Sequence, residues 1–92
     1  MEIGAKSTST LVVTEQLTAA VMGSGDLPVL ATPAMIALME NAAMKAVAEA
    51  LPDDQTTVGS LMNASHLKPT AVGDTGSATA TLVAIEGRKL TF

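Results

Sequence analysis

The alternation of hydrophobic and polar positions changes several times along the chain, and each change marks an expected element. Residues 4–13 are small and β-branched with a period of two, which predicts a first strand. Residues 14–22 fit a short helix that stops at the glycine-rich residues 23–26, which we interpret as a plain turn. Residues 27–32 are expected to be extended, because Pro28 disfavours helix in the residue before it.

The most apolar stretch follows and predicts one long helix. We expect Thr32 to be its N-cap and Pro33 its first residue, with the helix continuing to about Ala50. At about 100° per residue, the apolar side chains form one wide face. This face holds Met35, Met39, Ala42, Ala43, Ala46 and Ala50, with Ile36 and Val47 at its shoulder, and the far side holds Asn41, Lys45 and Glu49.

After the helix, the pattern predicts strands and one hairpin. Residues 56–65 have strand character, residues 68–74 form a loop, and residues 76–85 alternate again. Glu86-Gly87-Arg88 is a hairpin turn signal, and residues 89–92 begin the return strand. This order indicates a single α+β domain over residues 1–92. The last strand is so short that Leu90 and Phe92 are poorly covered, so we expect the domain to be incomplete at its C-terminus.

Composition and charge exclude several classes of function. Phe92 is the only aromatic residue, so an internal cavity would be lined by aliphatic and thioether groups. The net charge is −4 and the five basic residues form no cluster, which argues against nucleic acid as a partner. No signal peptide and no membrane span fits the sequence. A chain of 92 residues buries a modest core, and a partner chain would help it.

The absence of cysteine and the single histidine narrow the possible chemistry. Disulfides, a thiolate nucleophile and cysteine-ligated zinc are excluded, and no metal site is expected. The lack of cysteine is compatible with a cytoplasmic protein.

Three side chains combine reactivity with an unusual setting, and each also has an ordinary explanation. Thr32 could serve only as the helix N-cap. Glu40 lies at the border of the apolar face, where burial would poise it as a base or nucleophile, but its side chain could also swing into water. His66 is the only imidazole and could carry protons near neutral pH, although a lone histidine is more often a surface or core residue.

Three segments resemble a known family. Residues 30–43, 57–74 and 80–92 resemble the fluoroacetyl-CoA thioesterase-like branch of the hot dog superfamily. The resemblance implies a hot dog fold, in which an antiparallel sheet wraps around one long central helix, here apparently truncated at its C-terminal strands. It also implies a homodimer, or a dimer of dimers, with acyl-CoA bound at the dimer interface.

The resemblance implies a site and a reaction as well. It assigns the catalytic roles to Thr32, Glu40 and His66, and the substrate-binding roles to Gly59, Pro33 and Leu30. The implied reaction is hydrolysis of a small acyl-CoA to the free acid and CoA, with no cofactor, because CoA is part of the substrate. Fluoroacetyl-selective members close their pocket with aromatic residues before the threonine. Leu27, Val29 and Leu30 stand there in this chain, so fluoroacetate is not expected as the natural acyl group.

The mechanism and the functional class stay open at this point. Glu40 could attack the thioester directly or activate water, while Thr32 orients the carboxylate, His66 moves protons and the Gly59 N–H polarises the carbonyl near the helix start. The alternatives are a hot dog dehydratase or a thioesterase of another branch, a non-catalytic acyl-CoA binding module and a purely structural α+β domain. The structural alternative predicts an exposed Glu40 with His66 far from it.

Overall fold

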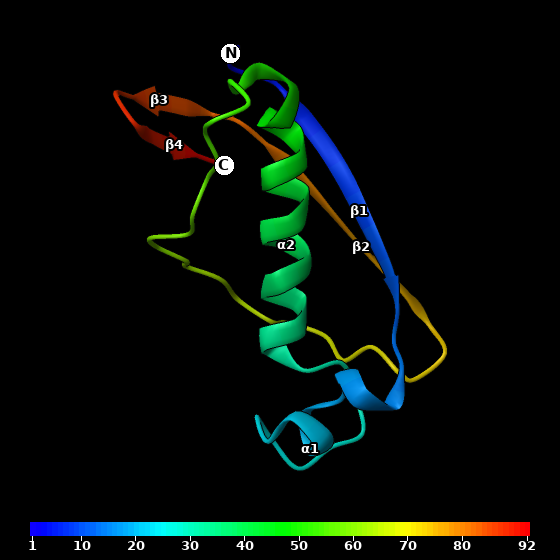
Figure 1. Ribbon diagram of the computed structural model, residues 1–92. Helices are drawn as coiled ribbons and strands as arrows, with labels where there is room; N and C mark the ends of the chain where they lie inside the picture. Colours follow the sequence, from blue (N-terminus) through cyan, green and yellow to red (C-terminus); the bar gives the residue numbers. More distant parts are fainter.

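One long helix lies against a two-stranded antiparallel sheet in the computed structural model, which describes residues 1–92 (Figure 1). The sheet pairs β1 (Lys6–Val12) with β2 (Thr75–Thr81) over seven residues, from Lys6 opposite Thr81 to Val12 opposite Thr75. The β-branched threonines of both strands suit such a ladder. The predicted first strand is therefore confirmed, and it pairs with a strand far away in the sequence.

The long helix α2 (Thr32–Val47) continues into one 3₁₀ turn, η2 (Ala48–Ala50). Its N-cap is Ala31, whose extended backbone places its carbonyl to accept from the amides of Ala34 and Met35. Thr32 is thus the first helical residue and caps nothing, so the expected N-cap role is wrong. The Thr32 hydroxyl remains free for another partner.

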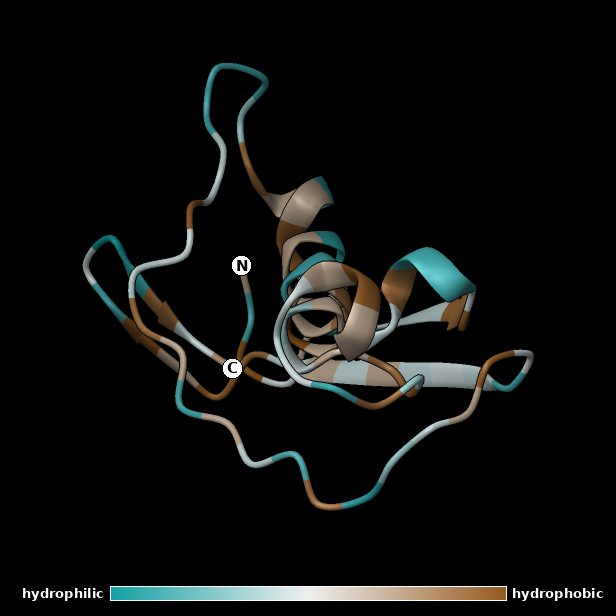
Figure 2. Ribbon diagram, turned by 90° about the horizontal axis from the view of Figure 1, so that it is seen from below, coloured by the Kyte–Doolittle hydropathy of each residue, from teal (hydrophilic) through white to brown (hydrophobic).

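The face of α2 that meets the sheet overlaps only in part with the expected one. Of the residues expected there, Ala42 and Val47 are buried, but Met35 and Met39 are only half-buried. Ala34 and Leu38 are buried although they were not assigned to this face. Asn41 was expected on the far side of the helix, yet its side chain accepts a hydrogen bond from Ser9 of β1. Apolar residues occupy most of the helix circumference (Figure 2), so the sequence has little contrast from which to choose the packed face.

The interior is small. Only 10 of the 92 residues are buried, and one cluster consists of Val13, Leu30, Ala31 and Ala34. Leu82 is fully buried where the chain leaves β2. The molecule is elongated, with extents of 41 × 24 × 21 Å and a radius of gyration of 14.6 Å. None of its helices is both long and apolar enough to cross a membrane.

The segment before α2 folds back on itself. The predicted helix over residues 14–22 is divided into a 3₁₀ turn η1 (Glu15–Leu17) and the short helix α1 (Ala19–Met22). Buried Thr18 separates them, caps α1 by accepting from the Val21 amide, and donates to the Glu15 carbonyl. The Ala31 amide then bonds the Leu17 carbonyl, which fixes the entry to α2.

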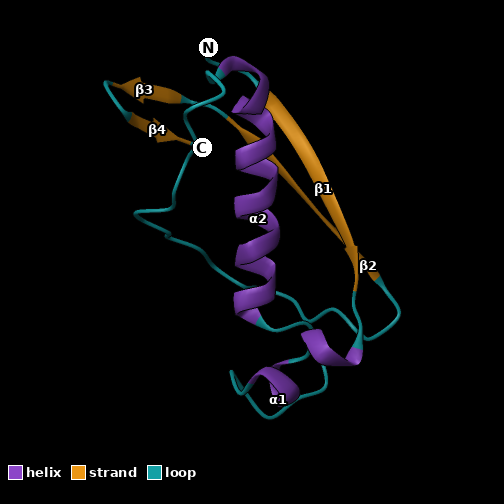
Figure 3. Cartoon of the chain, viewed as in Figure 1, coloured by secondary structure: helices purple, strands orange, loops and turns teal.

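Residues 56–65 are not a strand, although their composition predicts one. An extended segment becomes a strand only when another strand pairs with it, and these residues pair with none and are drawn as a loop (Figure 3). Val58 and Leu61 are 87% and 86% exposed. In Figure 1 the segment runs back along α2, on the other side of the helix from β1 and β2.

The C-terminal hairpin is confirmed. β3 (Ala84–Glu86) and β4 (Lys89–Thr91) pair through a turn at Gly87, which has a φ of 62°, and Arg88. The predicted strand over residues 76–85 is divided between β2 and β3, because Leu82 and Val83 are not in strand conformation.

Candidate functional site

One ridge of α2 carries two of the predicted site residues. Thr32, Ile36 and Glu40 follow each other at four-residue spacing, so their side chains leave the same side of the helix. The extended segment from Gly59 to His66 runs antiparallel to this ridge, with Gly59 beside Glu40 and His66 beside Thr32. The site residues are therefore held by the helix on one side and by this segment on the other.

At the N-terminal end of the ridge, Thr32 Oγ1 lies 2.8 Å from His66 Nδ1. Thr32 can make this hydrogen bond because Ala31 has taken over the capping position. The chain beyond His66 is fixed by the Leu30 amide, which bonds the Thr70 carbonyl. The half-buried imidazole makes no other hydrogen bond, so its Nε2 is available to a bound molecule.

Eight residues further along the helix, the Glu40 carboxylate lies against Gly59. A Cβ added at Gly59 would come 2.7 Å from Glu40 Oε2, a contact too short for real side chains. The backbone of Gly59 does not have a positive φ, so the position requires glycine for close approach and not for its backbone conformation. The Gly59 amide makes no hydrogen bond within the chain.

The three predicted catalytic residues do not meet in one chain. Thr32 and Glu40 are separated by eight residues of helix, or about 12 Å along its axis. Glu40 is exposed to solvent in the single chain, which matches the alternative in which its side chain swings into water. The Thr32 hydroxyl forms a hydrogen bond with His66. It does not reach the Glu40 carboxylate, although the sequence-based hypothesis was that Thr32 orients this carboxylate. One chain thus presents two separate pairs, Thr32 with His66 and Glu40 with Gly59.

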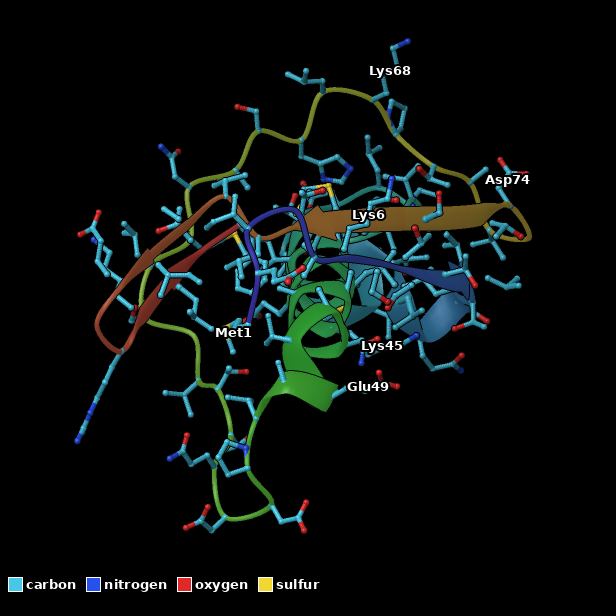
Figure 4. All side chains as sticks on the ribbon, turned by 90° about the horizontal axis from the view of Figure 1, so that it is seen from above. Met1, Lys6, Lys45, Glu49, Lys68 and Asp74 are labelled. Carbon is cyan, nitrogen blue, oxygen red and sulfur yellow. The ribbon has the colours of Figure 1, made fainter.

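A cavity of about 280 Å³ opens beside Thr32 and His66. Of the residues predicted to bind substrate, Leu30 lies in its wall, whereas Pro33 is exposed and lies outside it. The resemblance had already placed Leu27 and Val29 at the pocket. The rest of the wall comes from Ala19 and from two loops, Ser24 to Asp26 and Leu67 to Pro69, which no local pattern singled out. Lys68 points outward from this segment (Figure 4). No three His, Asp or Glu side chains gather as metal ligands.

Comparison with known proteins identifies similar sequences and structures. The sequence model of a family described as fluoroacetyl-CoA-specific thioesterase matches residues 13–92. A phenylalanine-to-alanine mutant of the fluoroacetyl-CoA-specific thioesterase FlK, in complex with fluoroacetate and CoA, superposes with a TM-score of 0.89 at 30% identity, covering 98% of this chain and 77% of that one. A threonine-to-serine mutant of FlK in complex with acetyl-CoA gives 0.89 at 30% identity, covering 98% and 72%.

A thioesterase-superfamily structure with a slightly lower sequence identity also has the same fold. A Thermus thermophilus hypothetical protein described as a thioesterase superfamily member superposes with a TM-score of 0.87 at 28% identity, covering 97% of this chain and 66% of that one. No curated protein matches the sequence. The predicted hot dog architecture, with antiparallel strands around one long helix, is confirmed by these superpositions.

Proposed function

Because the chain belongs to the fluoroacetyl-CoA-specific thioesterase family and is an acyl-CoA thioester hydrolase, we propose that it works as a homodimer with two shared active sites. In each site, Thr32 and His66 of one subunit face Glu40 and Gly59 of the partner subunit. The substrate is a small acyl-CoA, and the products are the free acid and CoA. The observation that carries the proposal is the separation of the two pairs along α2.

The amount of exposed surface supports a second copy. The chain exposes 6419 Å², whereas a compact monomer of its mass exposes about 5,000 Å². The excess is larger than the roughly 800 Å² that each partner buries in a standard interface. Val58, Leu61 and Leu67, all at least 85% exposed, lie on or next to the segment that carries Gly59 and His66. A partner that covers these side chains would therefore also approach the site.

Two-fold symmetry would bring the Thr32–His66 pair of one subunit to the Glu40–Gly59 pair of the other. In a two-fold dimer, if one residue meets a second residue on the partner, the second meets the first in the other subunit. Two antiparallel copies of α2 would place Glu40 of each subunit opposite Thr32 of the other. Each dimer would then hold two equal sites, and the acyl-CoA would lie between the subunits.

The proposed reaction uses each group at a defined atom. The Gly59 amide, which has no partner within the chain, stabilises the oxyanion as the thioester carbonyl is attacked. Glu40 either attacks the carbonyl carbon to form a mixed anhydride, which water then hydrolyses, or removes a proton from the attacking water. In both routes the carbon–sulfur bond breaks, and His66, held by Thr32, supplies the proton that the CoA thiolate accepts. The proton that the hydrolytic water releases then returns to His66.

The acyl group is proposed to enter the cavity beside Thr32 and His66. Leu27, Val29 and Leu30 form its aliphatic wall, and no aromatic side chain narrows it. We therefore expect small aliphatic acyl groups in place of fluoroacetyl. The proposal needs no cofactor beyond the CoA of the substrate, and it places the enzyme in the cytoplasm.

Steady-state hydrolysis tests the function directly. The protein should release free CoA from acetyl-, propionyl- and butyryl-CoA, which a binding module would leave intact. A dehydratase would act instead on a 3-hydroxyacyl-CoA, such as 3-hydroxybutyryl-CoA, and would form an enoyl thioester by loss of water. Glu40→Gln and His66→Ala should each lower kcat by about a hundredfold or more. Wild-type turnover in both variants would refute the assignment of these residues.

A mixing experiment tests the shared site. After refolding together in equal amounts, inactive Glu40→Gln and His66→Ala chains form half of their dimers as heterodimers. In each heterodimer one site contains both mutations and the other contains neither, so activity should return to about a quarter of the wild-type value. If all three residues acted within one subunit, every site would stay defective and no activity would return.

A further inference from the structure

The buried side of α2 consists of aliphatic residues without polar groups. Ala34, Leu38, Ala42 and Val47 are its buried side chains, and two of these four are alanines. Alanine side chains offer few protrusions, so their packing alone does not fix the rotation of the helix about its axis. Some other contact must set the angle at which the ridge with Thr32 and Glu40 faces the extended segment.

A polar pair crosses this interface. Ser9 Oγ donates a hydrogen bond of 2.7 Å to Asn41 Oδ1, and Ser9 is only 5% exposed. α2 makes just one other hydrogen bond between side chains, that of Thr32 with His66 at its first residue. Ser9 and Asn41 therefore fix the middle of the helix, one residue from Glu40.

We propose that Ser9 and Asn41 are positioning residues for catalysis, whose hydrogen bond holds α2 at the rotation that places the Glu40 carboxylate against Gly59. The inference rests on the proposed function, because it presumes that the position of this carboxylate matters for turnover. Packing gives no reason for a hydroxyl at this point, since an alanine at position 9 would suit an interface lined by aliphatic side chains.

The effect of losing the bond follows from the geometry of a helix. A rotation of roughly 10° moves an atom about 6 Å from the helix axis by about 1 Å. A displacement of about 1 Å in a reacting group can lower the rate by about a hundredfold. A small rotation of α2 is thus sufficient to affect turnover without disrupting the fold.

The test compares variants on both sides of the bond. Ser9→Ala removes the donor, Asn41→Leu removes the acceptor at similar volume, and Asn41→Asp keeps an acceptor oxygen. We expect the first two to lower kcat for acetyl-CoA by about tenfold or more, with KM within about twofold, and Asn41→Asp to stay within about threefold of wild type. The double variant Ser9→Ala/Asn41→Leu should be no slower than the slower single variant, because both changes remove the same bond.

A matched control separates positioning from general stability. Thr8 Oγ1 lies 2.7 Å from Thr79 Oγ1, in an exposed hydrogen bond between β1 and β2. Thr8→Val removes this bond from the residue next to Ser9 and should leave kcat unchanged. Urea unfolding of every variant shows whether each is folded under the assay conditions.

The outcomes distinguish this inference from the proposed function. If Glu40→Gln is inactive while Ser9→Ala and Asn41→Leu keep the wild-type kcat, the positioning role is overturned and the function stands. An equal loss in Asn41→Asp and Asn41→Leu would also overturn it, since the retained acceptor would then make no difference. If Glu40→Gln keeps full activity, it is the proposed function that fails.

Discussion

Replacing Gly59 with alanine would displace the Glu40 carboxylate while leaving the fold intact. The backbone of Gly59 has no positive φ, so alanine can adopt it without strain. The added Cβ would lie 2.7 Å from Glu40 Oε2, whereas ordinary contacts begin at 3.4 Å. The carboxylate must therefore move away by about 0.7 Å or more.

We expect Gly59→Ala to lower kcat strongly and to change the stability only slightly. The displaced atom is the free end of an exposed, flexible side chain, so the free energy of unfolding should change by no more than about 0.5 kcal/mol. A shift of this size in a reacting carboxylate should lower kcat by about tenfold to a hundredfold. This loss corresponds to about 1.4 to 2.7 kcal/mol of activation free energy.

The assay measures kcat and KM with acetyl-CoA, together with the urea midpoint. Gly76→Ala is the matched control, because its added Cβ would meet only Leu11 Cδ1, at 4.0 Å, and its backbone has no positive φ. We expect this control to keep the wild-type kcat. A Gly59→Ala protein with wild-type kcat would refute the reasoning, and so would a loss of activity that follows a loss of the folded state.

Three further changes test the site and the fold. Thr32→Val removes the hydrogen bond to His66 and should lower kcat by about tenfold or more. The thermal stability should hardly change, because Thr32 is not the N-cap of α2. A decrease of about 1 kcal/mol in the free energy of unfolding would instead indicate a capping role. Leu82→Ala opens a cavity at a fully buried position and should lower the free energy of unfolding in urea by about 2 to 5 kcal/mol. A decrease of less than about 1 kcal/mol would contradict the observed burial of Leu82. Gly87→Ala places a side chain at a φ of 62° and should lower stability by about 1 kcal/mol, whereas an unchanged melting temperature would argue against the left-handed turn.

Local patterns were sufficient for the elements whose formation depends on their own residues. The long helix and the hairpin at Gly87 follow from apolar content and turn chemistry, and both are confirmed. Residues 56–65 have the composition of a strand and are not one, because strand formation also needs a neighbour that the sequence pattern cannot supply. The rotation of α2 was missed for a related reason, since alanines lie on most of its sides and the bond from Ser9 is not visible in the sequence.

The sequence could nominate candidate site residues but could not predict their arrangement. Thr32, Glu40 and His66 stood out by chemical type and by resemblance, and these remain the proposed catalytic residues. Their grouping depends on which residue caps α2 and on the path of the segment after it, and neither is encoded locally. Thr32 and His66 are 34 positions apart and meet, whereas Thr32 and Glu40 share one helix and do not.

Because the interior is small, the stability of the folded subunit should depend on the protein concentration. With 10 of 92 residues buried, a lone subunit gains little free energy from its own packing. In the proposed homodimer, association supplies part of that free energy, and mass action then makes the melting temperature rise with protein concentration. Dilution would remove activity and folded structure together, so a specific activity is meaningful only at a stated enzyme concentration.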